Sequence, residues 1–301
     1  MILKKITIFT PTYNRDFCIH QVYESLLKQT NKNFKWLIID DGSIDDTSSI
    51  IEKWIEKGLL EIDYVFQKNK GMLGAHNTAH SLIDTELTIC IDSDDFMPYD
   101  AVESILKIWK NYSQNFSVAG IVGLDCYKNG KIIGDSFQEN FSKSKYKHVQ
   151  KIKGDKKYVY RTDLLKEFGP YPTVEGEKFP AQGYLYRLID ADYDLIAVNK
   201  ILCVVEYLPD GNSFNKISSY LKNPRGFAIH RLLLMETGET ILLKFRNAIH
   251  YVSSCIISGD YNKVIFNRFF YLTIPAIPLG IILYLFLKSK KGGSVNKKLN
   301  K

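Results

Sequence analysis

The sequence predicts an α/β fold with a mostly parallel central sheet, flanking helices and a C-terminal helical extension that associates with membranes. Two observations carry this prediction. In the first 110 residues, four short apolar runs alternate with stretches of helical periodicity, which is typical of strands joined by crossover helices. Beyond residue 215 the pattern is strongly helical, and residues 269–287 form a run of 19 residues without a charge.

Length, composition and charge indicate how many domains the chain has and which kinds of partner it binds. The chain has 301 residues, 45% of them hydrophobic, which is enough for one main domain with its own core plus an appendage. Its net charge of +7 is uneven, because six lysines follow residue 287. A basic tail beside an apolar stretch favours anionic lipid as a partner. Since no nucleic-acid-binding signature is present, we expect a membrane surface and no nucleic acid among the partners.

Cysteine usage and the N-terminus point to the cytoplasm. The five cysteines are odd in number, widely spaced and without a C-x-x-C pair, which favours free thiols in a reducing compartment. The N-terminus enters a strand pattern directly, without the apolar region of a signal peptide. We therefore expect the catalytic part at the cytoplasmic face of the cell membrane, held there peripherally or by a C-terminal anchor.

The elements of the first half follow from local pattern. Apolar runs predict strands at residues 5–10, 34–40, 61–66 and 88–91, and periodicity predicts helices at 17–29, 46–57, from about 74, and 100–111. Pro11 follows the first strand directly. Because proline lacks the N–H donor that a ladder needs, we expect the strand to stop there.

Two carboxylates end the second strand. Asp40 is explained equally well by simple turn chemistry, whereas Asp41, as a second acid at a strand end, would serve as an acceptor for a base or a ribose. Ser43 and Asp46 follow at the spacing of a capping box, which predicts a helix beginning at residue 46.

A glycine-containing loop follows the third strand. Gly71 and Gly74 permit close backbone approach, and a helix beginning near Gly74 would direct its N–H groups at an anion. We interpret this loop as a candidate phosphate or ribose contact. His76 is expected in the loop or on the helix surface rather than as a metal ligand.

The fourth strand ends in Asp92, Asp94 and Asp95, three carboxylates within four positions. Such acids repel one another unless a cation or hydrogen-bond donors offset their charge. Oxygen ligands alone suit a hard divalent ion such as Mg²⁺ or Mn²⁺, shared with substrate phosphates. The alternative is a solvated acidic turn. Open α/β sheets place ligands at this edge, so we favour a metal and phosphate site.

The middle of the chain is less regular. Asn129-Gly130 predicts a hairpin turn between apolar runs at 119–124 and 131–134, and residues 138–157 are expected to form a polar loop. A strand and helix are predicted within 158–168, a helix at 183–191 and a strand at 195–207. Glu175 and Glu177 lie on a glycine-broken loop, which suits either a general base or a solvated acidic loop.

The C-terminal third divides in two. Residues 220–257 read as amphipathic helices, and the charge-free run at 269–287 would reach roughly 28 Å as a helix, close to the thickness of a bilayer core. Pro275, Pro278 and Gly280 interrupt this run. We therefore favour a kinked, re-entrant or interfacial anchor over a simple span, with a buried core helix as the third possibility. The expected domains are residues 1–215, 216–262 and 263–301.

Four linked motifs carry a family resemblance. They are Pro11-Thr12-Tyr13-Asn14, Asp40-Asp41-Gly42-Ser43, the segment from Asn69 through Gly71 to Asn77, and Asp92-Ser93-Asp94-Asp95. In order and spacing they resemble the family 2 glycosyltransferases of the GT-A fold, of the capsule, lipopolysaccharide and O-antigen type. The resemblance implies an inverting hexosyltransferase. It would move a sugar from a nucleotide-sugar, with UDP as the best guess, to a saccharide or lipid-linked saccharide acceptor in cell-surface polysaccharide synthesis.

The resemblance also implies roles for individual residues. The nucleotide-sugar would be held by Pro11, Thr12, Tyr13, Asn14, Asp41, Gly71, Asn77, Asp92 and Ser93. Asp92 and Asp94, with Asp95 beside them, would bind Mn²⁺ or Mg²⁺. Within the Gly-Glu-Lys-Phe segment, Glu177 is the first choice for the general base and Glu175 the second.

The chain departs from the family pattern at two places. Gln182 stands where members often have an acid, and residues 206–211 replace a Tyr-Arg-x-His-like segment. In that second segment Asp210 could take the ligand role of the histidine.

Three other functions compete with this interpretation. A haloacid-dehalogenase-like phosphatase needs its D-x-D on an early strand with a Thr shortly after, and residues 95–97 supply neither. A sugar nucleotidyltransferase needs a glycine-rich N-terminal loop, which residues 10–15 lack. A catalytically degenerate membrane-bound scaffold or binding protein is the third. The intact Asp41, Asp92 and Asp94 count against it, while Gln182 and the missing histidine count for it.

Overall fold

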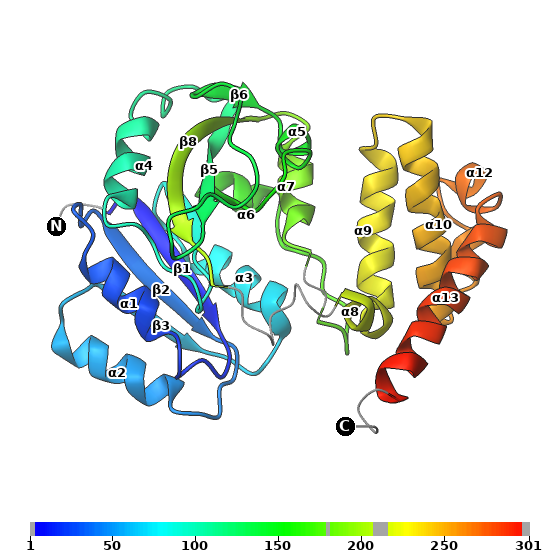
Figure 1. Cartoon of the computed structure of the whole chain (residues 1–301), viewed down its shortest axis with the longest axis horizontal. Coiled ribbons are helices and arrows are strands. Elements are labelled where there is room, and N and C mark those ends of the chain that lie inside the picture. The colour runs from blue at the N-terminus through cyan, green and yellow to red at the C-terminus, as the bar shows by residue number, and fades with distance from the viewer. Residues whose placement is uncertain (1–3, 179–180, 207–215, 297–301) are drawn as a thin grey trace. The chain divides into compact units, whose positions relative to one another are not determined.

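The computed structural model describes residues 4–178, 181–206 and 216–296 of the chain (Figure 1). It separates into two compact units, which we call the sheet unit (residues 1–171 and 185–208) and the helical unit (residues 172–184 and 209–301). The division into residues 1–215, 216–262 and 263–301 stays a prediction. The five cysteines are free thiols.

The sheet unit is built on one mixed sheet of eight strands in the order β3-β2-β1-β4-β7-β5-β8-β6. The strands are β1 (Ile6–Thr12), β2 (Phe34–Asp40), β3 (Ile62–Phe66), β4 (Leu87–Cys90), β5 (Val118–Cys126), β6 (Ser142–Ser144), β7 (Lys156–Arg161) and β8 (Asp194–Val204). The four predicted N-terminal strands pair in parallel, as expected. However, β7 lies between β4 and β5 and runs antiparallel to both, so the sheet is less uniformly parallel than the sequence indicated.

Helices cover both faces of this sheet (Figure 1). Those of the first 206 residues are α1 (His20–Leu27), α2 (Thr47–Lys57), α3 (Gly71–Leu82), α4 (Ala101–Trp109), α5 (Tyr146–Val149), α6 (Thr162–Glu167) and α7 (Gly183–Ile189). The apolar faces of α1, α2 and α4 share one core with the inner strands, while α3 packs on the opposite face against Phe9, Leu37 and Ile39. The α1 to α4 crossovers therefore bury the strands on both sides.

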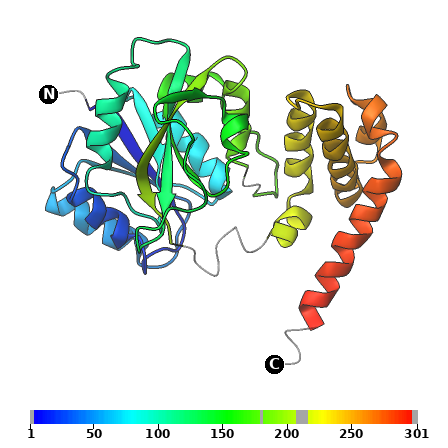
Figure 2. The ribbon, with the colours of Figure 1, turned by 45° about the horizontal axis from the view of Figure 1, so that its top comes forward.

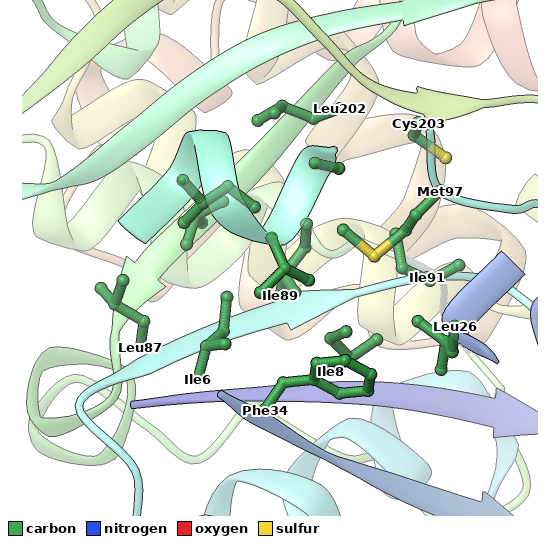
Figure 3. Close-up of a cluster of buried hydrophobic side chains, with 14 of the residues drawn as sticks. Ile6, Ile8, Leu26, Phe34, Leu87, Ile89, Ile91, Met97, Leu202 and Cys203 are labelled. Carbon is green, nitrogen blue, oxygen red and sulfur yellow. The ribbon is translucent and has the colours of Figure 1, made fainter. Parts of the chain in front are cut away.

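The largest core explains why the strands read as apolar runs. Ile6, Ile8 and Ile89 from adjacent strands are fully buried against Leu26 of α1 and Met97 (Figure 3). A strand covered on both faces needs apolar side chains at nearly every position, not at every second one.

Pro11 does not end β1, and this corrects the sequence prediction. The carbonyl of Phe9 accepts a hydrogen bond from Ile91 N at 3.0 Å, and that of Thr12 accepts one from Asp41 N at 2.8 Å, so alternate residues face β4 and β2. Pro11 faces the β4 side, where the last paired residue of β4 is Cys90, opposite Phe9. Because no partner strand lies beside Pro11 there, its missing N–H breaks no ladder bond.

Of two predictions for the middle of the chain, one is confirmed and one was wrong. Residues 127–131 form the expected hairpin turn, in which Gly130 N donates to the Tyr127 carbonyl at 2.8 Å and Tyr127 N to the Lys131 carbonyl at 2.9 Å, and the returning segment makes a short antiparallel bridge between Cys126 and Ile132. The expected loop at 138–157 contains β6, which pairs with β8, and the short helix α5. Strand β6 has only three residues and carries polar side chains, so its sequence gives no apolar signal.

The helical unit has its own apolar core. Its helices are α8 (Lys216–Lys222), α9 (Pro224–Glu236), α10 (Ile241–Ser258), α11 (Asn262–Ile265), α12 (Phe270–Thr273) and α13 (Ile277–Asn296). Tyr251 and Val252 of α10 lie at the centre of the core, and Gly280 lets α13 approach so closely that a Cβ there would lie 2.5 Å from Val252 Cγ1.

The charge-free run at 269–287 is divided between α12 and α13, and α13 is one continuous helix (Figure 2). Among the helices in the described parts of the chain, none is both long enough and apolar enough to cross a bilayer.

Candidate active site

The predicted motifs meet at one edge of the sheet. Thr12 pairs with Asp40 and Phe9 with Cys90, so the segments that follow β1, β2 and β4 leave the sheet at its carboxyl edge. The chain moves from β1 to β2 on one side and enters β4 on the other. This reversal of strand order is where open α/β sheets bind ligands.

Thr12 and Tyr13 are the residues of the first motif that have capacity for a ligand. Thr12 is buried, and its hydroxyl has no hydrogen-bond partner among the described residues. Buried hydroxyls are nearly always paired, so this one is a candidate ligand contact. Tyr13 follows it with 46% of its surface exposed, which leaves the ring available for stacking on a base.

Asn14 has a structural role. Its φ of 51° is the left-handed conformation, which Asn tolerates better than most residues. Asn14 N donates to Ser43 Oγ and Asn14 Oδ1 accepts from Ile44 N, both at 2.9 Å. The loops after β1 and β2 are thereby fastened together. Ser43 is engaged here, and Asp46 makes no side-chain cap on α2, so the predicted capping box is wrong.

Asp40 behaves as the turn residue that one interpretation predicted. Its Oδ1 accepts from Ser43 N at 2.8 Å and its Oδ2 from the Tyr64 hydroxyl at 2.9 Å. Burial and the adjacent Asp40 carboxylate raise the pKa of Tyr64, which therefore stays a donor.

Asp41 is committed to the protein itself. Its Oδ1 accepts from Gln67 Nε2 and from Lys70 N, and its Oδ2 accepts from Gly71 N, all at 2.7 Å. Helix α3 begins at Gly71, three residues before the predicted start, and the anion at its N-terminus is the Asp41 carboxylate. The expected contact between Asp41 and the nucleoside stays a prediction.

The remaining residues of the glycine loop are also engaged. The side chain of Asn77 exchanges two hydrogen bonds with the backbone of Tyr171, at 3.0 and 2.8 Å. His76 is buried, against the prediction of a surface position, and its ring lies edge-on to Phe9 at 4.9 Å. Helix α3 is only weakly amphipathic, so its sequence gave little indication of which side is covered. Burial lowers the pKa of His76 to about 3, so it is a neutral packing residue.

The acidic motif occupies a segment fixed at both ends. Ile91 N is bonded to β1, and Phe96 exchanges backbone hydrogen bonds of 3.0 and 2.8 Å with Val204 at the end of β8. In between, Asp92 and Asp94 are half-buried while Ser93 and Asp95 are buried. This alternation puts the Asp92 and Asp94 carboxylates on the more open side and turns Asp95 inward.

The residues present fit a metal that is shared with a substrate. In the parts of the chain that the structure describes, no group of three or more His, Cys, Asp or Glu side chains is arranged to hold an ion. Mg²⁺ and similar ions commonly use one or two carboxylates and complete their shell with phosphate oxygens and water. Asp92 and Asp94 supply that number. Asp210, the alternative ligand, lies outside the described residues.

Asp95 has partners that sequence reasoning missed. Its Oδ1 accepts from Glu206 N at 3.2 Å, and its Oδ2 lies 3.6 Å from Lys157 Nζ at the start of β7. Cys203 Sγ donates to the same Oδ2 at 3.6 Å. Burial, opposed by Lys157, raises the pKa of Asp95 to about 7, and the charges of the two other acids of the motif add to the shift.

Asp125, on β5, belongs to the same buried group. It is 3% exposed, and burial raises its pKa to about 6 although Lys157 opposes the shift. Burial alone would lower the pKa of Lys157, but Cys203, Asp125 and Asp95 outweigh it, so this lysine stays charged. The sequence signal for Lys157 was weak, because the expected strand began at residue 158, one position after it.

The two candidate bases lie in the helical unit. Glu177 Oε1 accepts from Arg225 N at 3.0 Å and its Oε2 from Gly226 N at 2.8 Å, so this carboxylate caps the N-terminus of α9. Glu175 is exposed on the turn before it. The choice between them stays a prediction, and Phe179 of the same motif is outside the described residues.

Comparison with known proteins identifies the family to which this chain is similar. The sequence profile of Glycosyl transferase family 2 matches residues 7–162. Glycosyltransferase GlyA of Streptococcus pneumoniae serotype 4 is 28% identical over 167 residues, which are 54% of this chain and 23% of that protein. The poly(ribitol-phosphate) beta-N-acetylglucosaminyltransferase TarS of Staphylococcus aureus is 24% identical over 192 residues, 61% of this chain and 33% of that protein. The matches thus span a third or less of these two relatives.

Solved structures agree on the fold. The crystal structure of S. aureus TarS 1-349 in complex with UDP-GlcNAc has a TM-score of 0.61 at 18% identity, over 90% of this chain and 79% of that one. The mannosyltransferase PcManGT of Pyrobaculum calidifontis, in complex with GDP-Man and Mn²⁺, has a TM-score of 0.57 at 14% identity, over 93% and 87%. Both likenesses support a GT-A-like architecture. Because the family profile covers just over half of its 301 residues, the chain belongs to glycosyl transferase family 2.

Proposed function

We propose that this glycosyltransferase moves a sugar from a UDP-sugar to a saccharide or lipid-linked saccharide acceptor in the synthesis of a cell-surface polysaccharide. The observation that carries the proposal is the placement of Thr12, Asp92 and Asp94 at the same carboxyl edge of the sheet, where the buried Thr12 hydroxyl has no hydrogen-bond partner among the described residues. A nucleotide-sugar carries a nucleoside, which would lie against Thr12, and a diphosphate, which would lie against the metal held by Asp92 and Asp94. TarS, by its name and its bound ligand, uses such a donor and a polymeric acceptor, which is consistent with the proposal.

In the proposed mechanism each residue has a limited task. Thr12 and Tyr13 orient the nucleoside, and Asp92 and Asp94 would hold Mn²⁺ or Mg²⁺ against the diphosphate. The ion, when bound, supplies a positive charge that stabilises the leaving diphosphate. Glu177, or Glu175 in its place, removes the proton from the acceptor hydroxyl so that its oxygen attacks the anomeric carbon and inverts it. General-base catalysis of this kind typically contributes about 10² to 10⁴ in rate.

The donor site is tested by thermal-shift measurements with UDP-, GDP-, CMP- and dTDP-sugars, with and without Mn²⁺. Binding to the folded state raises the melting temperature. We expect a shift with one nucleotide class that requires both Mn²⁺ and Asp94, and therefore disappears in Asp94→Ala. Asp192→Ala, which removes an exposed carboxylate, is the matched control and should behave as the wild type. Metal-dependent binding without turnover would favour the scaffold function, and no shift with any nucleotide would contradict the donor assignment.

We further propose that the helical unit holds the enzyme on the cytoplasmic face of the membrane, as an interfacial anchor. Ile282, Leu285 and Phe286 of α13 are 61%, 56% and 52% exposed and lie on one face, at i, i+3 and i+4. The exposed Lys288 and Lys290 follow them. Exposed apolar side chains beside basic ones suit a surface of anionic lipid.

Vesicle sedimentation tests the anchor. We expect binding to vesicles with anionic lipid that weakens in high salt and is lost in Ile282→Ser/Leu285→Ser/Phe286→Ser. Ile44→Ser, which removes an apolar side chain that is 90% exposed in the sheet unit, is the control. Equal sedimentation of the triple variant and the wild type would contradict the anchor.

A further inference from the structure

A lysine with most of its side chain covered lies directly behind the acidic motif. Lys157 is the second residue of β7, and only 13% of its side chain is exposed. Its Nζ lies 3.6 Å from Asp95 Oδ2, and 6% of the Asp95 side chain is exposed. A buried lysine is costly unless acids surround it, so its presence here requires a compensating benefit.

The lysine connects the two halves of the sheet. Strand β7 lies between β4, which the acidic motif follows, and β5, which contains Asp125. Lys157 pairs across the ladder with Gly123, two residues before Asp125. The charges of Asp95 and Asp125 both act on Lys157. The ammonium group is therefore paired with Asp95.

Asp95 is fixed from both sides, and the turn of the motif is fixed with it. One oxygen of Asp95 is bonded to Glu206 N and the other faces Lys157. Asp95 N donates to the Asp92 carbonyl at 3.0 Å, which closes the turn that carries Asp92 and Asp94. If Asp95 moved toward solvent, it would open this turn and add a third negative charge beside the other two.

We propose that Lys157 is a positioning residue for donor binding: by pairing with Asp95 it keeps that carboxylate inside and the Asp92 and Asp94 carboxylates directed outward. This inference rests on the proposed function, because it assigns Asp92 and Asp94 to the metal-bound diphosphate. Lys157 does not touch the substrate. Groups that orient metal ligands from behind typically change metal affinity about 10- to 100-fold when they are lost.

The test compares Lys157→Met, Lys157→Arg and the double variant Lys157→Met/Asp95→Asn. The Mn²⁺ concentration that half-saturates binding of the nucleotide class identified in the thermal-shift panel is measured by calorimetry, and KM and kcat are measured separately. We expect Lys157→Met to raise this Mn²⁺ concentration and the donor KM about tenfold or more. Lys157→Arg should retain most of the affinity. The double variant should recover much of it, because the amide that replaces the Asp95 carboxylate carries no charge and needs no cation to keep it inside.

Lys35→Met is the matched control. Lys35 has 15% of its side chain exposed and pairs with Asp63 and Asp84 at 3.6 and 2.6 Å, but it lies near the start of β2, at the opposite edge of the sheet. Its replacement should lower the melting temperature without changing Mn²⁺ dependence.

Three outcomes would overturn the inference. If Lys157→Met binds Mn²⁺ and nucleotide as the wild type does, and loses only thermal stability, the role is structural. If the double variant is as weak as Lys157→Met, the lysine contacts the ligand directly. A wild type without metal-dependent nucleotide binding would overturn the proposed function and the positioning role together, whereas the first two outcomes leave the proposed function intact.

Discussion

The carboxylate of Asp41 accepts a hydrogen bond from the amide of Gly71 at 2.7 Å, thirty residues further along the chain. With the bonds from Lys70 N and Gln67 Nε2, it joins the end of β2 to the start of α3. An anion at this helix N-terminus is stabilised by the unpaired N–H groups and by the helix dipole. Asp41 therefore stabilises the backbone that borders the predicted nucleoside site.

Asp41→Ala should lower the free energy of unfolding by about 2 to 4 kcal/mol, because it leaves buried N–H donors without a partner. Chemical denaturation measures this loss. Asp46→Ala is the control, since the exposed Asp46 makes no side-chain cap on α2, and it should cost about 0.5 kcal/mol or less. An Asp41→Ala variant as stable as the control would show that the three bonds contribute nothing.

Thr12→Val should weaken nucleotide binding without lowering stability. The Thr12 hydroxyl has no partner among the described residues, so its removal leaves no donor or acceptor unpaired within them. Calorimetry should show about a 5- to 30-fold loss of nucleotide affinity, the value of a lost hydrogen bond of about 1 to 2 kcal/mol.

Thr10→Val provides the comparison for Thr12→Val. Thr10 Oγ1 accepts from Trp36 Nε1 at 2.9 Å, so this change should lower stability by about 1 to 3 kcal/mol and leave nucleotide affinity unchanged. A loss of stability in Thr12→Val, with binding intact, would exclude Thr12 from the donor site.

Much of the parallel half of the fold could be predicted because its signals are local. Each of the first four strands is an apolar run of its own, and the acids at residues 92–95 follow one of them directly. The place of β7 could not be predicted, because the choice between β4 and β5 as neighbours is made by contacts far apart in sequence. The same reason hid the place of Lys157, whose ion-pair partner Asp95 lies 62 positions earlier.

The sequence predicted where the site residues lie better than it predicted which groups their side chains contact. Thr12, Asp41 and Asp92 meet at the edge where strand-end reasoning placed them. Local sequence could not show that the carboxylates of Asp41 and Glu177 would cap helices, because each donor comes from a segment about 30 to 50 residues away. Asn77 has likewise found its partner 94 residues away, in the backbone of Tyr171.

Glu177→Gln should abolish turnover while keeping donor binding, if Glu177 is the base. The substitution replaces one of the two acceptor oxygens by an NH₂ group, so either Arg225 N or Gly226 N then faces a donor, and the helical unit should lose about 1 kcal/mol of stability. Turnover and thermal denaturation are measured on the same preparations. Glu175→Gln, on the exposed neighbour, should keep both stability and turnover. Full activity of Glu177→Gln with loss of activity in Glu175→Gln would move the base to Glu175.

As the pH falls below 6.5, two buried histidines should destabilise the sheet unit, while Asp95 and Asp125, whose pKa values burial raises, should stabilise it. Burial lowers the pKa of His76 to about 3, and burial with the neighbouring His76 does the same for His80. An unfolded histidine has a pKa of about 6.5, so between pH 6.5 and 3 the unfolded state binds more protons than the folded state. The stabilisation from each neutral histidine is therefore complete above pH 6.5 and is lost as the pH falls through this window, by about 2 kcal/mol per histidine at pH 5. Urea denaturation at pH 7.5 and pH 5 isolates this contribution as a difference between proteins, because Asp95 and Asp125 titrate equally in all of them. Between these two pH values the free energy of unfolding of the wild type should change unfavourably by about 2 kcal/mol more than that of His80→Gln. It should change by the same amount as that of His20→Gln, whose side chain is exposed. Equal changes in all three proteins would mean that His80 is not held neutral in the folded state.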